Sequence, residues 1–366
     1  MTTIYSPMKF LGFPDRLKGV RERRVLSPVS IRIKPMNHCN HDCWYCAYRV
    51  SNLQLGEDMN LRDKIPEDKM FEIADDIVSL GVRAVTFSGG GEPLIYKPLP
   101  DVIERLAEGG VRIGSLTNGA NLKGRVADAF AEHGTWVRIS IDSWDDESCV
   151  ESRKVKSGEF TAIMNNVRDF IARDSKCILG ISFIIGKKNA PHIYDVCKML
   201  KGIGVNHVKL AATVISNAGR ENNEYHAEFQ DTARAGIEKA LELADESFQV
   251  LDHYHEAEER FDKDYEICPF LNFLTVIGAD LNVYTCQDKA YTDGGMLGSI
   301  KDRSFKDFWF SDENHKRLYA VNPSRDCRHH CVTHAKNLAV FEALESTPDE
   351  SVLDALDIDP DHGVFV

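Results

Sequence analysis

Residues 30–211 alternate short apolar segments with longer amphipathic ones, and this alternation limits the possible folds more than any other feature. SIRIKP at 30–35 has the composition of a strand, and EDKMFEIADDIVSLG places apolar residues three and four apart, as a helix does. Helical segments separate five more strand-like segments, at 83–88, 111–117, 136–142, 177–185 and 207–212. Six such steps predict a parallel sheet with right-handed crossovers, either doubly wound or curled into a full or partial barrel.

The pattern changes after residue 212. The segment 226–245 predicts one helix, and NFLTVIGADLNVYTC predicts a β-hairpin that turns at Gly278–Asn282. An irregular stretch with short helices then leads to a last helix in THAKNLAVFEALE. The sequence ends in TPDESVLDALDIDPDHGVFV, which is acidic without Lys or Arg; it predicts either a frayed tail or, at its apolar end, an added edge strand.

The charge balance excludes some partners. The chain has 366 residues and a net charge of −13, which argues against nucleic acid or an anionic membrane surface, although a local basic pocket is compatible with it. No segment approaches the roughly 20 apolar residues of a membrane span, and the basic start lacks the apolar core of a signal peptide. Ten cysteines without such a signal indicate a reducing, cytoplasmic compartment, where clustered thiols bind metals or act in catalysis.

Four unusual segments follow the first four predicted strands. In a β/α sheet or barrel, functional residues collect on the loops at the carboxyl ends of the strands. We therefore expect these segments to meet at one rim, although they are far apart in the sequence. They are MNHCNHDCWYC after 30–35, SGGGEP after 83–88, TNG after 111–117 and IDS at the end of 136–142.

The first of these loops holds three cysteines, Cys39, Cys43 and Cys46, in a C-x3-C-x2-C pattern. Thiolates are soft ligands that suit iron–sulfur clusters, zinc or copper(I). A structural zinc site takes four ligands, and the nearest candidates for a fourth are His38 and His41. Three cysteines on a four-iron cluster leave one iron open for another molecule, so this chemistry favours a cluster over zinc.

A C-x3-C-x2-C loop after the first strand of a β/α domain resembles the radical S-adenosylmethionine (SAM) superfamily, over about residues 30–215. The resemblance implies a partial (β/α)6 barrel of parallel strands and a four-iron, four-sulfur cluster held by Cys39, Cys43 and Cys46. The open iron would bind the amino and carboxylate groups of SAM. Reductive cleavage of SAM would then give a 5′-deoxyadenosyl radical that abstracts a hydrogen atom.

The glycine-rich loop is similar to the Gly-Gly-Glu motif of this family. By that resemblance, Gly90 and Gly91 present backbone carbonyls to the SAM ammonium, with Glu92 nearby. Glycine suits the role because it lets the backbone approach a ligand closely. The alternative is a simple glycine-rich turn before Pro93.

Further SAM contacts follow from the same resemblance. Ser140 and Asp142 alternate along one strand and point to one face, where they would bind the ribose and carboxylate. The other implied contacts are Tyr45 near the adenine, Asn118 in TNG, and Arg153 at the SAM carboxylate. Asn118 in an ordinary turn and Arg153 as a solvated residue at a helix start are the alternatives.

A second group of four cysteines lies beyond the barrel segment. C-hairpin-C followed by C-x3-C resembles the twitch or shortened SPASM extension of radical SAM enzymes, in which a β-hairpin and a short helix hold one auxiliary four-iron, four-sulfur cluster. Zinc is the competing interpretation, because four thiolates suit a closed tetrahedral site. The members are Cys268, Cys286, Cys327 and Cys331. We expect the remaining three, Cys149, Cys177 and Cys197, to be buried structural residues.

These features divide the α/β chain into a partial (β/α)6 barrel and a C-terminal extension of cysteine-rich β-hairpin plus helix. The predicted parts are a lead-in at 1–29, the radical SAM barrel at 30–215, a helical connector at 216–262, the auxiliary-cluster domain at 263–335, and a C-terminal helix and acidic tail at 336–366.

The resemblance implies a radical SAM oxidoreductase or epimerase. Aminocyclitol dehydrogenases of this family carry one auxiliary cluster, which favours a small polar substrate such as a sugar, cyclitol or nucleotide. A peptide or protein maturase is the alternative, and a non-catalytic metal-binding or electron-transfer protein is a third. An electron donor such as a flavodoxin or ferredoxin is expected. Asp288 is the candidate proton acceptor, against an exposed hairpin-end Asp, and His253 and His255 are further candidates.

Overall fold

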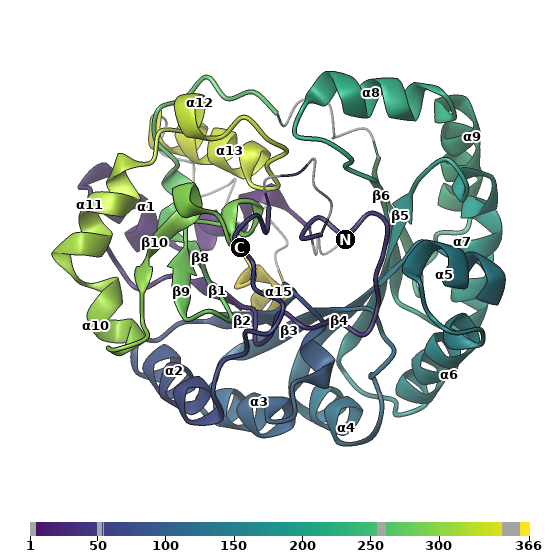
Figure 1. Cartoon of the computed structure of the whole chain (residues 1–366), viewed down its shortest axis with the longest axis horizontal. Coiled ribbons are helices and arrows are strands. Elements are labelled where there is room, and N and C mark those ends of the chain that lie inside the picture. Colours follow the sequence, from purple (N-terminus) through teal and green to yellow (C-terminus); the bar gives the residue numbers. More distant parts are fainter. Residues whose placement is uncertain (1–4, 50–52, 54, 255–260, 346–358) are drawn as a thin grey trace.

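One ten-stranded sheet connects the described residues, in the order β10-β9-β8-β1-β2-β3-β4-β5-β6-β7 (Figure 1). In this computed structural model, placement is described for residues 5–49, 53, 55–254, 261–345 and 359–366. The strands β1 to β7 are parallel and follow chain order. They are β1 Ser30–Ile33, β2 Ala84–Phe87, β3 Arg112–Thr117, β4 Gly134–Ile141, β5 Ile178–Ile185, β6 His207–Ala212 and β7 Gln249–His253.

The crossover helices lie outside the curved sheet, as Figure 1 shows. Their buried faces match the apolar spacing of the sequence; Met70, Ile73 and Ile77 of α2 are fully buried. This arrangement confirms the predicted partial barrel. The helices are α2 Glu67–Ser79, α3 Leu99–Glu108, α4 Gly124–His133, α5 Asp146–Arg153, α6 Glu159–Ile171, α7 Ile193–Ile203, α8 Gly219–Ala227 and α9 Gln230–Leu241.

The prediction of one helix over 226–245 was wrong, because α8 and α9 are separate. The break falls at Phe229, whose backbone N–H donates to the carbonyl of His226 and whose buried ring packs against Tyr225 and His226. The chain turns again where the Asp245 carboxylate accepts the backbone N–H groups of Ser247 and Phe248. It then enters β7, a seventh parallel strand that the sequence analysis did not predict.

The C-terminal extension joins the barrel sheet directly. β8 (Leu274–Ile277) pairs in parallel with β1, and β9 (Asn282–Tyr284) returns antiparallel to β8, which is the predicted hairpin. β10 (Met296–Ser299) adds a third strand antiparallel to β9, where an irregular stretch was expected. Four helices follow: α10 Phe305–Trp309, α11 Asp312–Ala320, α12 Pro323–Asp326 and α13 His334–Glu345. No helix of the described residues has both the length and the apolar character to cross a bilayer.

Two segments close the end of the barrel opposite the rim. They are η1 (Pro7–Gly12) with Tyr5 and Ser6 before it, and α15 (Pro360–Gly363) with residues 364–366 after it. The Lys9 ammonium donates to the carbonyls of His362 (2.8 Å) and Phe365 (3.3 Å). The last residues therefore form no edge strand, and 359–366 do not form a frayed tail; residues 346–358 lie outside the described part.

Candidate active site

The glycine-rich loop packs directly on the cysteine loop. The backbone N–H of Gly91 donates to the carbonyl of Met36 at 3.0 Å. A Cβ on Gly91 would lie 1.9 Å from the carbonyl oxygen of His38, and one on Gly90 would lie 2.1 Å from Oδ1 of Asn37. Glycine is therefore required here by the close approach of two loops. A contact of either glycine with SAM stays a prediction.

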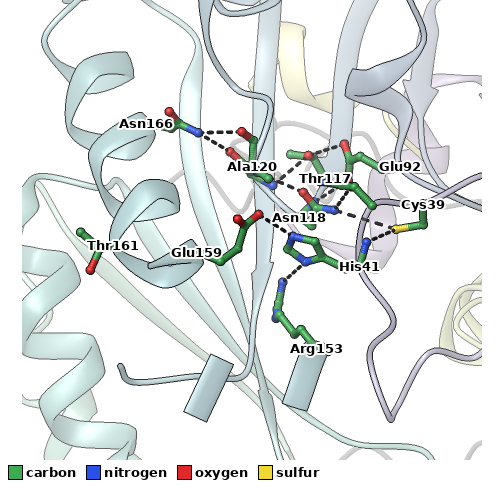
Figure 2. Close-up of polar contacts among 12 residues, drawn as sticks. Cys39, His41, Glu92, Thr117, Asn118, Ala120, Arg153, Glu159, Thr161 and Asn166 are labelled. Atoms are coloured by element: carbon green, nitrogen blue, oxygen red, sulfur yellow. Dashed lines mark hydrogen bonds and ion pairs between the residues drawn. The ribbon is translucent and has the colours of Figure 1, made fainter. Parts of the chain in front are cut away.

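Glu92 ties the second loop to the third. Its Oε1 accepts hydrogen bonds from the Thr117 hydroxyl (2.6 Å) and the Leu94 amide (2.9 Å), and its Oε2 accepts from the Asn118 amide (2.7 Å) (Figure 2). The side chain is 2% exposed, and this burial raises the pKa of the carboxyl group. Glu92 thus fixes where the predicted SAM-binding turn TNG lies relative to the glycine loop.

Asn118 points from this turn to the cysteine loop. Its side-chain amide donates to Oδ1 of Asn40 at 2.8 Å and lies 3.9 Å from Sγ of Cys39 (Figure 2). On the other side, Asn166 of α6 donates to the carbonyls of Gly119 and Ala120, both at 3.0 Å. The turn is therefore held from two sides, with one side chain directed at the first cysteine.

Arg153 is the buried centre of the fourth loop. It is the last residue of α5 and 1% exposed, which excludes the alternative of a solvated arginine at a helix start. Its Nε donates to Oδ1 of Asp142 at 2.7 Å, and its Nη2 donates to the Ser140 carbonyl (2.7 Å) and the Tyr45 hydroxyl (2.9 Å). Burial opposes the charge, but Tyr45 and Asp142 raise the pKa of Arg153 well above its ordinary value.

These contacts bring three predicted SAM-binding residues, Tyr45, Asp142 and Arg153, and the backbone of a fourth, Ser140, into one cluster at the end of β4. Most N–H groups of the Arg153 guanidinium bind protein groups, so its visible role is to hold the cysteine loop against β4. A contact with the SAM carboxylate stays a prediction for Arg153, as the other ligand roles do for its partners.

His41 joins this cluster to α6. Its Nε2 lies 2.9 Å from Oε1 of Glu159, and its Nδ1 lies 3.4 Å from Nη1 of Arg153 (Figure 2). Burial lowers the pKa of His41. Both ring nitrogens have protein partners, which leaves His41 poorly placed as a fourth metal ligand. The sequence analysis missed this link, because nothing local in the sequence pairs His41 with a residue 118 positions away.

The three cysteines of the first loop are free and partly buried. Burial raises the pKa of each thiol, that of Cys43 to about 12, and the charge of Cys46 adds to this effect at Cys39 and Cys43. No group of three or more His, Cys, Asp and Glu side chains within the described residues is arranged to hold a single metal ion. The role of Cys39, Cys43 and Cys46 as cluster ligands therefore stays a prediction.

Two buried polar atoms beside the glycine loop fit a bound ligand. Oδ1 of Asn37 and Oγ of Ser88 are buried and have no hydrogen-bond partner among the described residues. Buried polar groups are rarely left unsatisfied in proteins. Together with three soft thiols nearby, these atoms are compatible with a cluster and a polar cofactor at the rim.

The second group of cysteines also gathers in space. Burial, Asp288 and the other three cysteines all raise the pKa of Cys286, so these groups lie near its thiol. Burial raises the pKa of Cys268 to about 12 and that of Cys327 to about 11. All ten cysteines of the chain are free of disulfides, and Cys149, Cys177 and Cys197 are buried as predicted. Whether the group of Cys268, Cys286, Cys327 and Cys331 holds a cluster or zinc stays a prediction.

Asp288 lies beside this group and is not an exposed hairpin end. Its Oδ2 accepts the backbone N–H of Val332 at 2.8 Å, and burial raises its pKa. A role as proton acceptor stays a prediction. His253 packs edge-on against Tyr5, with ring centroids 5.7 Å apart, whereas His255 lies outside the described residues.

Lys34 lies between the two cysteine groups, and the sequence analysis missed it. Its ammonium is 1% exposed and contacts the Tyr48 hydroxyl and the Gly89 carbonyl, both at 2.5 Å. Burial lowers its pKa to about 7. The signal was present in SIRIKP, where two basic residues, Arg32 and Lys34, alternate with buried apolar ones and so point to the barrel interior.

A cavity of about 320 Å³ occupies the barrel interior beneath the rim. Side chains of β1 to β6 line it, and the two segments that close the lower end of the barrel form its floor. It reaches the second cysteine group through Gln287, Val332 and Thr333. The cavity thus connects the floor of the barrel with the residues beside the second cysteine group.

A family pattern and several known proteins match the chain. The family described as Radical SAM superfamily matches residues 33–229, more than half of the chain. The S-adenosylmethionine-dependent nucleotide dehydratase of Lacinutrix mariniflava is 29% identical over 121 residues, 33% of this chain and 25% of that protein. The probable GTP 3′,8-cyclase of Methanocaldococcus jannaschii is 26% identical over 176 residues, 48% of this chain and 56% of that protein. The chain therefore spans between a quarter and about half of these relatives.

Solved structures share the fold at low sequence identity. Streptococcus suis SuiB bound to precursor peptide SuiA superposes with a TM-score of 0.59 at 16% identity, over 88% of this chain and 76% of SuiB. Native anSMEcpe with bound AdoMet gives a TM-score of 0.57 at 16% identity, over 90% of this chain and 99% of anSMEcpe. These similarities extend through the C-terminal extension as well as the barrel.

Proposed function

The chain belongs to the radical SAM superfamily, and on that premise we propose that it cleaves SAM reductively and removes a hydrogen atom from a small polar substrate. The observation that carries the proposal is that hydrogen bonds fix the loops of the rim to one another. Gly91, Glu92 and Asn118 lock the three-cysteine loop to the loops after β2 and β3. Arg153 locks the same loop to β4.

The residues of the rim have separate proposed tasks. Cys39, Cys43 and Cys46 hold the cluster, which when bound and reduced supplies the electron that cleaves SAM to methionine and the 5′-deoxyadenosyl radical. Asn37 and Ser88 offer buried oxygens that accept no hydrogen bond from the described part of the chain, which suits hydrogen bonds to the polar groups of SAM. The backbone of the glycine loop provides close approach without side chains.

The remaining predicted contacts surround the same place. Tyr45, Ser140, Asp142 and Arg153 are already held against one another. Preorganised polar groups lose little entropy when a cofactor binds, so we propose that they orient SAM with little rearrangement. The match to the Radical SAM superfamily supports SAM as the cofactor.

We propose a small substrate, a sugar, cyclitol or nucleotide, that undergoes dehydrogenation or epimerisation. Support comes from the cavity of about 320 Å³, which lies at the lower end of the range for ligand sites. Its floor is closed by the two terminal segments, which disfavours an extended peptide passing through the barrel. The nucleotide-acting relatives agree with this size class. The similarity to peptide-bound SuiB is at 16% identity and carries the fold alone.

The second cysteine group is proposed to hold an auxiliary cluster, with zinc as the alternative metal. A dehydrogenation removes one further electron and a proton after the hydrogen atom has left. The auxiliary cluster would supply the electron acceptor, and Asp288 is the proposed proton acceptor, because it lies beside Cys286 and next to the cavity residue Gln287. A flavodoxin or ferredoxin is the expected electron donor for the first cluster.

The test is anaerobic reconstitution followed by analysis of metal and product. Wild type is expected to bind about eight irons per chain, from two four-iron clusters, and to form 5′-deoxyadenosine with SAM and dithionite. Cys43→Ala is expected to form none, and Cys149→Ala, a buried cysteine outside both groups, is expected to match wild type. About four irons plus one zinc would retain SAM cleavage but remove the auxiliary electron acceptor. A fully loaded wild type that never forms 5′-deoxyadenosine, with candidate substrates present, would contradict the proposal.

A further inference from the structure

The cavity inside the barrel is strongly basic, although the chain as a whole is acidic. The chain carries 57 Asp and Glu against 44 Lys and Arg. Among the described residues that line the cavity, however, none is Asp or Glu, and five are Lys or Arg. These are Lys9, Arg32, Arg138, Lys209 and Lys336. Such a local reversal of charge in a pocket attracts anions.

Three of these cations, Arg32, Arg138 and Lys209, form the basic cluster. They occupy β1, β4 and β6, at positions whose side chains line the barrel interior. The charge of Arg138 is close enough to Arg32 to lower its pKa further, in addition to the larger effect of burial. Like charges gathered in a low-dielectric interior favour a counter-charge in the same space.

For Arg32 and Arg138, the described side chains supply little of that counter-charge. The guanidinium of Arg32 makes no hydrogen bond or ion pair with any described residue. Asp288, which also accepts the backbone N–H of Val332, is the acidic residue that raises its pKa most. Nε of Arg138 is buried and has no hydrogen-bond partner among the described residues. Its Nη1 donates to the Tyr5 hydroxyl at 2.8 Å, which carries no charge.

His207 adds an unused donor to the same wall. It is 3% exposed, and its Nε2 lies 2.9 Å from the Tyr5 hydroxyl. Both hydrogen bonds of the Tyr5 hydroxyl are satisfied when Arg138 donates to Tyr5 and Tyr5 donates to Nε2 of His207. The proton of a neutral ring then lies on Nδ1, which has no partner among the described residues. Gly180 makes room for the ring, because a Cβ there would lie 2.1 Å from Nε2.

The basic cluster lies directly below the rim. Lys34 is the next interior position after Arg32 on β1, and it contacts the Gly89 carbonyl of the glycine loop. Ser140 is the next after Arg138 on β4, and Asp142 the next again. Two residues of a strand span about 7 Å, so the cluster is one to two such steps from the proposed SAM site. A ligand anchored on the cluster would reach the rim with its other end.

We propose that the basic cluster binds the phosphoryl group of the substrate, so that the enzyme acts on a phosphorylated small molecule. This inference rests on the proposed function, because the reaction at the rim is assumed and only the binding of the phosphoryl group is new. A phosphate ester brings roughly two negative charges and three acceptor oxygens, whereas a carboxylate brings one charge. Arginine guanidinium groups also match phosphate oxygens in a two-point geometry. The phosphoryl group would accept from Arg32, Arg138 and Nδ1 of His207.

The test measures binding of inorganic phosphate and pyrophosphate to the reconstituted holoenzyme by calorimetry. We expect wild type to bind pyrophosphate and Arg138→Gln to bind it about 10- to 100-fold more weakly, the range for losing a charge-assisted hydrogen bond. Arg138→Lys keeps the charge but loses the two-point geometry, so it is expected to bind pyrophosphate more weakly than wild type and more tightly than Arg138→Gln. The matched control is Arg125→Gln on the outer surface of α4, expected to bind like wild type, because Arg125 pairs with Asp101 far from the cavity.

Two results would overturn the proposal: no phosphate or pyrophosphate binding by wild type at millimolar concentration, or equal binding by Arg138→Gln. Tighter binding of acetate than of phosphate would also overturn it, since the cluster would then be a carboxylate site. Formation of 5′-deoxyadenosine without substrate is measured in parallel for the same proteins. That readout tests the proposed function separately, because it does not require the basic cluster.

Discussion

Replacing Arg153 by Met tests whether one buried side chain holds the cysteine loop in place. Arg153 is 1% exposed and bonds Asp142, the Ser140 carbonyl and Tyr45 at 2.7, 2.7 and 2.9 Å. Removing one partner of a buried ion pair costs about 3–5 kcal/mol, because the other charge is left unpaired. Asp142, which is 5% exposed, would be that unpaired charge.

The effect is measured locally by hydrogen exchange in the cysteine loop. The amides of Asp42 and Trp44 donate to the carbonyls of Arg153 and Ser152 at 2.8 and 3.0 Å, so they report directly on loop opening. A loss of 3 kcal/mol corresponds to exchange that is more than about 100-fold faster. SAM affinity of the reconstituted enzyme should fall in the same variant.

Two further variants separate charge from packing. Adding Asp142→Asn to Arg153→Met removes the unpaired charge, and should recover about 2 kcal/mol of the loss. Arg125→Met, which breaks an exposed pair, should change exchange in the loop by less than about threefold. Acceleration below tenfold in Arg153→Met, or no recovery in the double variant, would refute the reasoning.

Two other predictions follow from close packing and from burial. Gly91→Ala should displace the cysteine loop and lower the iron content, because the added Cβ would lie 1.9 Å from the carbonyl oxygen of His38. Gly202→Ala is the control and should keep the full iron content, because no atom lies within 4 Å of the added Cβ. Burial lowers the pKa of His207 from 6.5 to about 3, so the unfolded chain binds more protons between these values and stability falls as the pH drops below 6.5. From pH 7.5 to 5 this loss of stability is about 2 kcal/mol. The thermal midpoint should therefore fall less for His207→Gln than for wild type over that interval. Equal falls for the two proteins would contradict this prediction. His133→Gln, a partly exposed control, should behave like wild type.

The meeting of the rim loops could be predicted from sequence because it follows from chain order. Parallel strands in sequential order bring their carboxyl ends together, so the loops carrying Cys39, Gly91, Asn118 and Asp142 had to converge. It was also predictable that this loop needs glycine for a close approach of its backbone. What the sequence did not reveal is that Gly91 approaches the backbone of the cysteine loop itself.

The contacts of Arg153 and the basic cavity were missed for physical reasons. Arg153 lies in a short, polar helix whose end cannot be located from periodicity, and its partners come from two other loops. Strands of a parallel barrel are usually apolar on both faces. The basic residues in SIRIKP, WVRISID and HVKLAA therefore indicated a basic cavity in the interior. Their convergence depends on strand register, which was not predicted.

The central claim is that Cys39, Cys43 and Cys46 hold a cluster with one iron open to SAM. Electron paramagnetic resonance of the dithionite-reduced protein, with and without SAM, tests it most directly. We predict that SAM changes the signal of one cluster in wild type and in Cys286→Ala, and that Cys43→Ala lacks the SAM-sensitive signal. A spectrum that SAM leaves unchanged in fully loaded wild type, or a SAM-sensitive signal that persists in Cys43→Ala, would contradict the account.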